Sequence, residues 1–209
     1  MRIRESAPLY GQGKKRVTYQ DYRQLPPDDF RHQLIEGEIV MTPAPKVVHQ
    51  IVKNNWLKAF QKFVESHQLG LVLDAPCDVY LDEHNVVQPD VFFISRDRLA
   101  IVTEEIVKGA PDLILEVLLP ASAYYDLVEK KALYARFGVK EYWIVDPKWQ
   151  WAEVYWNANN AFQLHQRAEK EGGLHSRLFP EFEVSLNEVF HSVPLWNTDS
   201  ASPEDGSGQ

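Results

Sequence analysis

Three segments of the chain place ionisable side chains inside patterns that predict burial. Asp90 precedes an apolar run of strand type, Glu116 interrupts a second such run, and Lys130 lies four residues after Asp126 in a helical pattern. Burying an unpaired charge costs several kcal/mol, so a buried carboxylate requires a compensating partner. Two carboxylates and one lysine held together in this way indicate a metal-dependent hydrolytic site.

Glu116 is the candidate that the residue pattern supports most directly. Strand alternation places it on the same face as Ile114 and Leu118, whereas Leu115 and Val117 point to the other face. The alternative interpretation is a salt-bridged glutamate or one at a sheet edge. The high cost of unpaired burial favours a role as a ligand.

Asp90 is a site candidate only together with Glu116, because an aspartate after proline is often only a turn residue. Asp90 lies at the matching stage of the preceding strand, and neighbouring strands are about 4.8 Å apart, close enough for two carboxylates to share one cation. Without a cation their repulsion would raise the pKa of one of them. Mg²⁺ suits this task, since it prefers oxygen ligands, takes one or two carboxylates and keeps several waters.

Lys130 shares one helical stripe with Asp126 and Tyr134, at spacings of four residues on either side. The same spacing is typical of an ordinary helical Asp–Lys pair, worth about 0.2–0.5 kcal/mol. Lys131 is a competing candidate. Spacing therefore leaves open whether Lys130 belongs to the site.

The elements that position these residues follow from changes in apolar period along the chain. We expect helices at 18–22, 47–66 and 123–137, strands at 32–41, 71–81, 86–95, 112–119 and 141–145, and a hairpin of 152–156 with 162–165. The nearly all-apolar strand 112–119 should lie in the middle of the sheet. The core order α-β-β-β-α-β predicts an α/β fold with a mixed β-sheet flanked by helices.

Length and composition predict one compact unit. The chain has 209 residues, of which 44% are hydrophobic, enough to bury one substantial core. We expect a single domain over residues 1–196 and a disordered acidic tail over 197–209, because the tail has almost no apolar residues.

Charge and cysteine content limit the cellular location and the binding partners that we expect. A single cysteine, Cys77, and the lack of a signal pattern or a long apolar run predict a soluble, cytoplasmic protein with no membrane contact. The formal net charge of −8 argues against broad attraction to nucleic acid. A role on nucleic acid would need a local basic patch.

Four blocks of the chain together match a pattern known from one family. They are 34–40 with Pro43, Pro45 and His49, then 88–90, then 110–118, and finally Asp126, Lys130 and the run 134–147. With these blocks the chain resembles the Uma-type putative restriction endonucleases of the PD-(D/E)XK nuclease superfamily. The resemblance covers roughly residues 19–190.

This resemblance implies a restriction-endonuclease-like fold and DNA cleavage with Mg²⁺ or Mn²⁺. By it, Asp90 is the aspartate of the PD motif and Glu116 the acidic residue of the (D/E)XK motif, with the Val117 carbonyl as a further metal ligand. The chain departs from the parent pattern at Leu118, where a lysine is usual. Lys130 matches the lysine that this family carries on the next helix, from which its ammonium would reach the same place.

Three further residues occupy family positions whose roles stay open. Glu36 and Glu38, on one face of the expected strand 32–41, match the Glu-Gly-Glu segment, and one of them completes the metal shell or a second site. His49, at the start of a long helix, is a proton shuttle, a phosphate contact or simply a hydrogen-bonding residue at a helix start. The loop 119–122 departs from the usual Ser-Pro-Ser-Thr.

Two hypotheses about function follow. The first is a metal-dependent endonuclease acting on DNA phosphodiester bonds, as a homodimer if it cuts both strands. The alternative is a catalytically inactive, nuclease-derived binding or interaction module, which the acidic balance and the few basic runs favour. Retention of Asp90, Glu116 and Lys130 favours the endonuclease, because a decayed site has no physical reason to keep three costly charges. The residues do not distinguish DNA from RNA.

Overall fold

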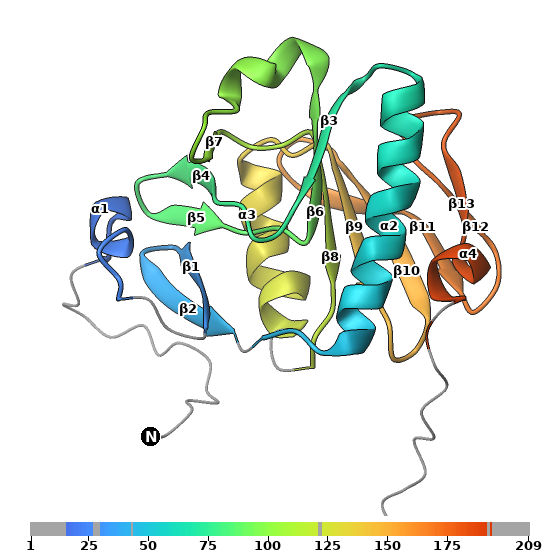
Figure 1. Cartoon of the computed structure of the whole chain (residues 1–209), viewed down its shortest axis with the longest axis horizontal. Coiled ribbons are helices and arrows are strands. Elements are labelled where there is room, and N and C mark those ends of the chain that lie inside the picture. The colour runs from blue at the N-terminus through green and yellow to red at the C-terminus, as the bar shows by residue number, and fades with distance from the viewer. Residues whose placement is uncertain (1–15, 27–29, 43, 121–122, 192, 194–209) are drawn as a thin grey trace, which may run out of the picture.

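The structure is a computed structural model that describes residues 16–26, 30–42, 44–120, 123–191 and 193 (Figure 1). The expected acidic tail at 197–209 lies outside these residues, as do Pro43 of the family pattern and part of the loop 119–122. No helix in the described part of the chain is long and apolar enough to cross a membrane.

A six-stranded mixed sheet forms the centre of the molecule (Figure 1). Its strand order is β11-β10-β9-β8-β6-β3, with bounds Phe162–Glu169, Trp151–Asn157, Glu141–Asp146, Leu113–Val117, Val91–Ser95 and Gly70–Asp74. Strand β8 pairs in parallel with β9 and antiparallel with β6. All five residues of β8 are buried, which confirms the predicted central position of this apolar strand.

Helices cover both faces of this sheet. Helix α2 (Val47–Ser66) has the bounds that its apolar period predicts. On the opposite face, the π-helical turn η2 (Tyr125–Glu129) continues into α3 (Lys130–Arg136). The segment η2–α3 connects the parallel strands β8 and β9, so the predicted strand–helix–strand crossover is confirmed.

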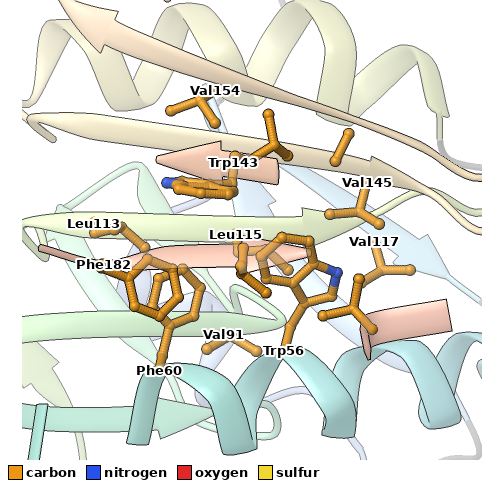
Figure 2. Packing of buried hydrophobic residues seen from close by; sticks show 14 of the residues in the cluster. Trp56, Phe60, Val91, Leu113, Leu115, Val117, Trp143, Val145, Val154 and Phe182 are labelled. Carbon is orange, nitrogen blue, oxygen red and sulfur yellow. The ribbon is translucent and has the colours of Figure 1, made fainter. Parts of the chain in front are cut away.

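Aromatic packing holds α2 against the sheet. Figure 2 shows Trp56 and Phe60 of α2 against side chains of the central strands and Phe182. The rings of Trp56 and Trp143 lie 5.2 Å apart, and those of Phe60 and Phe182 lie 4.8 Å apart. The small pair β12 (Gly173–His175) and β13 (Glu183–Ser185), with helix α4 (Leu186–Phe190), extends this core.

A second sheet of five strands lies beside the first and begins near helix α1 (Tyr19–Tyr22) (Figure 1). Its order is β2-β1-β5-β4-β7, with bounds Glu38–Thr42, Arg31–Ile35, Asn85–Val87, Val79–Asp82 and Val107–Lys108. A 3-10 helix, η1 (Arg96–Ile101), follows β6. The smaller sheet was not predicted as a separate layer.

Three predicted strands are wrong in their extent. The strand expected at 32–41 is the hairpin β1–β2, which turns at Glu36 and Gly37 with φ values of 52° and 78°. Two successive positive φ values match the twist of a two-residue hairpin turn. The strands expected at 71–81 and 86–95 are each interrupted, so that 75–78 and 88–90 carry the chain between the two sheets. Asp90 therefore lies where the chain crosses from one sheet to the other.

Candidate active site

Asp90, Glu116 and Lys130 meet in one buried pocket at the junction of the two sheets. The backbone N of Asp90 is 3.3 Å from Glu116 Oε2, and Lys130 Nζ is 3.0 Å from Glu116 Oε1. The pocket volume is about 20 Å³, which is room for one ion or one water-sized molecule. Its polar lining includes Arg31, Gln33, Thr42, His49, Asp90, Glu116, Asp126 and Lys130.

Glu116 projects from the central strand β8 toward the helix that supplies Lys130. It shares the face of Ile114 and Leu118, as its alternation predicts. Glu116 Oε1 accepts hydrogen bonds from Lys130 Nζ and from the Tyr134 hydroxyl, the latter at 2.7 Å. Burial raises the pKa of Glu116 to about 7, because the charge of Lys130 only partly offsets desolvation and the nearby carboxylates.

Asp90 has a hydrogen-bond partner on each oxygen. Arg31 Nη1 donates to Oδ1 at 3.0 Å. His49 Nε2 lies 3.0 Å from Oδ2, which also accepts from the Val117 backbone N at 2.9 Å. Burial alone would raise the pKa of Asp90, but the bond to His49 and the charges of Arg31 and Lys130 outweigh it and hold the pKa well below its usual range. Asp90 is therefore an ionised carboxylate, and His49 donates to it.

The π-helical turn positions a second carboxylate beside Lys130. Lys130 Nζ lies 2.9 Å from Asp126 Oδ1, so the ammonium bridges Asp126 and Glu116. Burial tends to lower the pKa of Lys130, yet these two carboxylates outweigh it and raise that pKa, so the group is charged. π-Helical turns occur often at functional sites. Lys131 instead lies over the ring of Tyr155, at 3.3 Å from the ring centroid.

The pocket residues that were not predicted as site residues include Arg31, Gln33 and Asp126. Arg31 and Gln33 occupy alternate positions of β1 and therefore share one face of that strand. Its spacing in the sequence predicts Asp126 only as a helical partner of Lys130. The period-2 placement of two long polar side chains beside buried Leu34 was the available signal for the first two.

Glu36 and Glu38 lie outside the pocket lining. Glu36 is exposed in the hairpin turn, where it forms ion pairs with Arg16 at 3.6 Å and with Arg136. Glu38 is also exposed, at the start of β2. The expectation that both share one strand face is wrong, because the turn separates them and pairs Glu38 with Ile35 across the hairpin.

The donor set of the pocket suits a hard cation with few protein ligands. Two buried carboxylates, Asp90 and Glu116, face a space for one ion. Within the described ranges, no three or more His, Cys, Asp and Glu side chains are grouped as a metal cage. Mg²⁺ and Mn²⁺ fit such oxygen donors, because Mg²⁺ binds through one or two carboxylates and keeps waters for the remaining positions. A closed zinc-type site would need four protein ligands.

The fold and the pocket together define an α/β protein of the restriction-endonuclease-like class. A crystal structure described as "a putative nuclease belonging to DUF820" from Anabaena variabilis ATCC 29413 is similar, with a TM-score of 0.69. The two chains are 17% identical, and the likeness covers 84% of this chain and 98% of that one. At this identity the likeness shows the fold.

The Uma2 family, described as "Putative restriction endonuclease", matches residues 19–187, and the chain belongs to this family. The resemblance that the four sequence blocks predict is thereby confirmed. No curated protein matches the chain.

Proposed function

We propose that the protein is a metal-dependent endonuclease that hydrolyses phosphodiester bonds of DNA. The observation that carries the proposal is the meeting of Asp90, Glu116 and Lys130 in one buried pocket of a nuclease-family fold. Burying three charged groups beside one pocket is costly. A catalytic site has a use for them, because it must hold both an acidic ligand set and a cation.

Asp90, Glu116 and the Val117 carbonyl would hold Mg²⁺ or Mn²⁺. When bound, the metal lowers the pKa of a coordinated water and stabilises negative charge on the phosphate. Asp90 is held ionised and in a fixed orientation by His49 and the Val117 backbone N. We therefore assign His49 to positioning Asp90 rather than to contacting phosphate.

Lys130 acts as a charged hydrogen-bond donor in this scheme. Its pKa is raised, so its ammonium orients the attacking water and stabilises developing negative charge instead of removing a proton. Asp126 keeps the ammonium in place from the other side, 2.9 Å away. The (D/E)XK pattern has a lysine two residues after the acidic residue, where this chain has Leu118. In this scheme Lys130 of helix α3 takes the role of that lysine.

One observation favours the alternative, an inactive module derived from a nuclease. Arg31 and Lys130 already compensate the pocket carboxylates, so the buried cluster needs no metal to be stable. In that case the protein would bind nucleic acid or a protein partner without cutting. Cleavage of both strands by the active form would favour a homodimer.

Metal-dependent thermal shift tests the ligand assignment. We expect Mg²⁺ and Mn²⁺ to raise the Tm of the wild type but not of Asp90→Ala or Glu116→Ala, because a ligand stabilises the state that binds it. Glu65→Ala, which removes an exposed carboxylate of α2, is the matched control and should keep the full shift. Equal shifts in all four proteins would refute the metal site.

Cleavage of plasmid DNA tests the chemistry. The wild type should nick DNA only with divalent metal, and Lys130→Ala should abolish nicking while it retains the thermal shift. A single-stranded RNA substrate, assayed in parallel, decides between DNA and RNA. Metal binding without cleavage of either substrate would favour the inactive module.

A further inference from the structure

Arg31 is the basic residue of the pocket that belongs to the smaller sheet. It is the first residue of β1 and pairs with Thr42 of β2. Its side chain is 19% exposed, and it lines the pocket that contains Asp90 and Glu116. An ion pair anchors it, from Nη1 to Asp90 Oδ1 at 3.0 Å.

The Nε–Nη2 edge of the guanidinium lacks acceptors in the part of the chain that the structure describes. Arg31 Nε and Nη2 are buried and have no hydrogen-bond partner among the described residues. A buried donor without a partner is costly, so this edge of the side chain calls for an acceptor. Nε and Nη2 form the edge whose two parallel N–H groups match two oxygens of one phosphate or carboxylate. Within a nuclease-type pocket, phosphate is the matching anion.

Both carboxylate oxygens of Asp90 already accept hydrogen bonds in the same arrangement. Arg31 occupies Oδ1, while His49 and the Val117 backbone N occupy Oδ2. The Oδ2 contacts come from α2 and from the backbone of β8, which are fixed by the core. The Oδ1 contact comes from a long side chain of the smaller sheet, so it is the contact that can be exchanged.

We propose that Arg31 binds the phosphodiester group of nucleic acid and, in doing so, leaves Asp90, so that Oδ1 becomes free for the metal. This inference rests on the proposed function and adds a substrate contact to it. Phosphate binding and metal binding are then coupled through one side chain. Without nucleic acid, Arg31 holds the site in a form that binds metal weakly.

Two separate binding measurements test the exchange. Affinity for a fluorescent duplex DNA is measured by anisotropy in EDTA, and affinity for Mn²⁺ is measured by electron paramagnetic resonance without DNA. In Arg31→Gln we expect DNA binding to weaken about tenfold and Mn²⁺ binding to tighten several-fold. A residue with a purely structural role would weaken both or change neither.

Two control variants separate geometry from charge. Arg31→Lys keeps the positive charge but loses the two-pronged edge, so DNA binding should still weaken several-fold. Arg177→Gln removes an exposed arginine whose guanidinium lies over Trp156, and both affinities should stay within about twofold. If Arg31→Gln fails to fold, Arg31→Lys decides the question.

Inorganic phosphate identifies the source of the anion. It should compete weakly with DNA in the wild type and not at all in Arg31→Gln. Competition by phosphate at DNA-like affinity would make the site a receptor for free phosphate and overturn the assignment to nucleic acid.

The inference and the proposed function can fail separately. Unchanged DNA and Mn²⁺ affinities in Arg31→Gln, with metal-dependent cleavage in the wild type, would overturn the role of Arg31 and leave the nuclease intact. If the wild type binds no Mn²⁺ with or without DNA, the nuclease and the exchange at Asp90 both fail. The phosphate contact of Arg31 is then upheld or overturned by the DNA affinities in EDTA alone.

Discussion

Two buried glutamates on opposite faces of the central sheet show how the same residue type serves structure in one place and chemistry in another. Glu141 of β9 is 0% exposed and Glu116 of β8 is 2% exposed. Glu141 accepts hydrogen bonds of 2.6 to 2.8 Å from four neutral donors, which are Trp143 Nε1, Ser176 Oγ and the backbone N atoms of Arg177 and Leu178. Glu116 is held by a charged lysine and a tyrosine and faces a pocket.

The two glutamates differ in whether their hydrogen-bond donors can be exchanged for another ligand. The four donors to Glu141 are fixed parts of the core or of the backbone, so this carboxylate fastens the segment 176–178 to the sheet. The ammonium of Lys130 also has Asp126 as a partner, so it can give up Glu116 without becoming unpaired. Burial alone therefore does not identify a catalytic carboxylate. A charged donor that has a second partner, as Lys130 has, distinguishes Glu116 from Glu141.

The largest effect on stability should come from Glu141→Ala. The substitution leaves four buried donors without an acceptor, at about 1–3 kcal/mol for each donor that water does not reach. We expect the free energy of unfolding to fall by about 4 kcal/mol or more, measured by urea denaturation. Glu141→Gln keeps one acceptor oxygen and should lose roughly half as much.

Glu141 should have no part in metal binding, because its carboxylate lies on the sheet face opposite Glu116. The Glu141→Gln protein should fold and keep the Mg²⁺-induced rise in Tm. Loss of that rise in a folded variant would show that the two carboxylates are not functionally distinct.

A smaller and pH-dependent effect should come from Glu116→Gln. The folded-state pKa of Glu116 is raised from 4.5 to about 7, so the folded protein holds a proton in this range that the unfolded chain releases. The contribution of Glu116 to stability is thus full below about pH 4.5 and is lost as the pH rises through 7. The wild type should lose on the order of 3 kcal/mol relative to Glu116→Gln between pH 4.5 and 8.

Urea unfolding of both proteins at several pH values checks this, since the other titrating groups are common to both. Parallel stability curves would mean that Glu116 has an ordinary pKa. The same titration predicts that Mn²⁺ affinity rises with pH up to about 7, because the metal binds the ionised carboxylate.

The smallest effect should come from Glu36→Gln and Glu38→Gln. Both side chains are exposed, and exposed ion pairs contribute about 0–1 kcal/mol. We expect unchanged thermal shifts with Mg²⁺ and stability within about 1 kcal/mol of the wild type. A lost thermal shift in either variant would return that residue to the metal shell.

The regular parts of the fold were predictable because their signals are local. Helix α2 follows from an apolar stripe at spacings of three and four, and the central position of β8 follows from its continuous apolar run. The face of Glu116 follows from alternation alone. These features depend on neighbouring residues and on no distant contact.

The division into two sheets was not predictable in this way. An apolar strand pattern does not say which strand is its partner, and β1 pairs with β5 some fifty residues further on. Pro76 and Pro89 were the local hints, since proline is found at strand ends and not within central strands. The hairpin turn at Glu36 was not predicted, because positive φ values are uncommon for residues other than glycine.

The same limit explains why Arg31 was missed. A charged residue at the first position of a strand usually lies in water, and its burial here arises only once β1 lies beside the crossing that contains Asp90. The π-helical turn had no local signal either, since 125–129 contains neither glycine nor proline.

The pocket is built from two structural units, because the chain crosses between the two sheets beside it. The larger sheet, its helices and the crossing segment 88–90 supply the acidic residues and Lys130, whereas Arg31 and Gln33 come from one face of the hairpin β1–β2. Alternate positions of that hairpin can be replaced without altering the backbone ladder of the larger sheet. Substrate preference could thus diverge in the hairpin while the acidic half of the pocket stays the same.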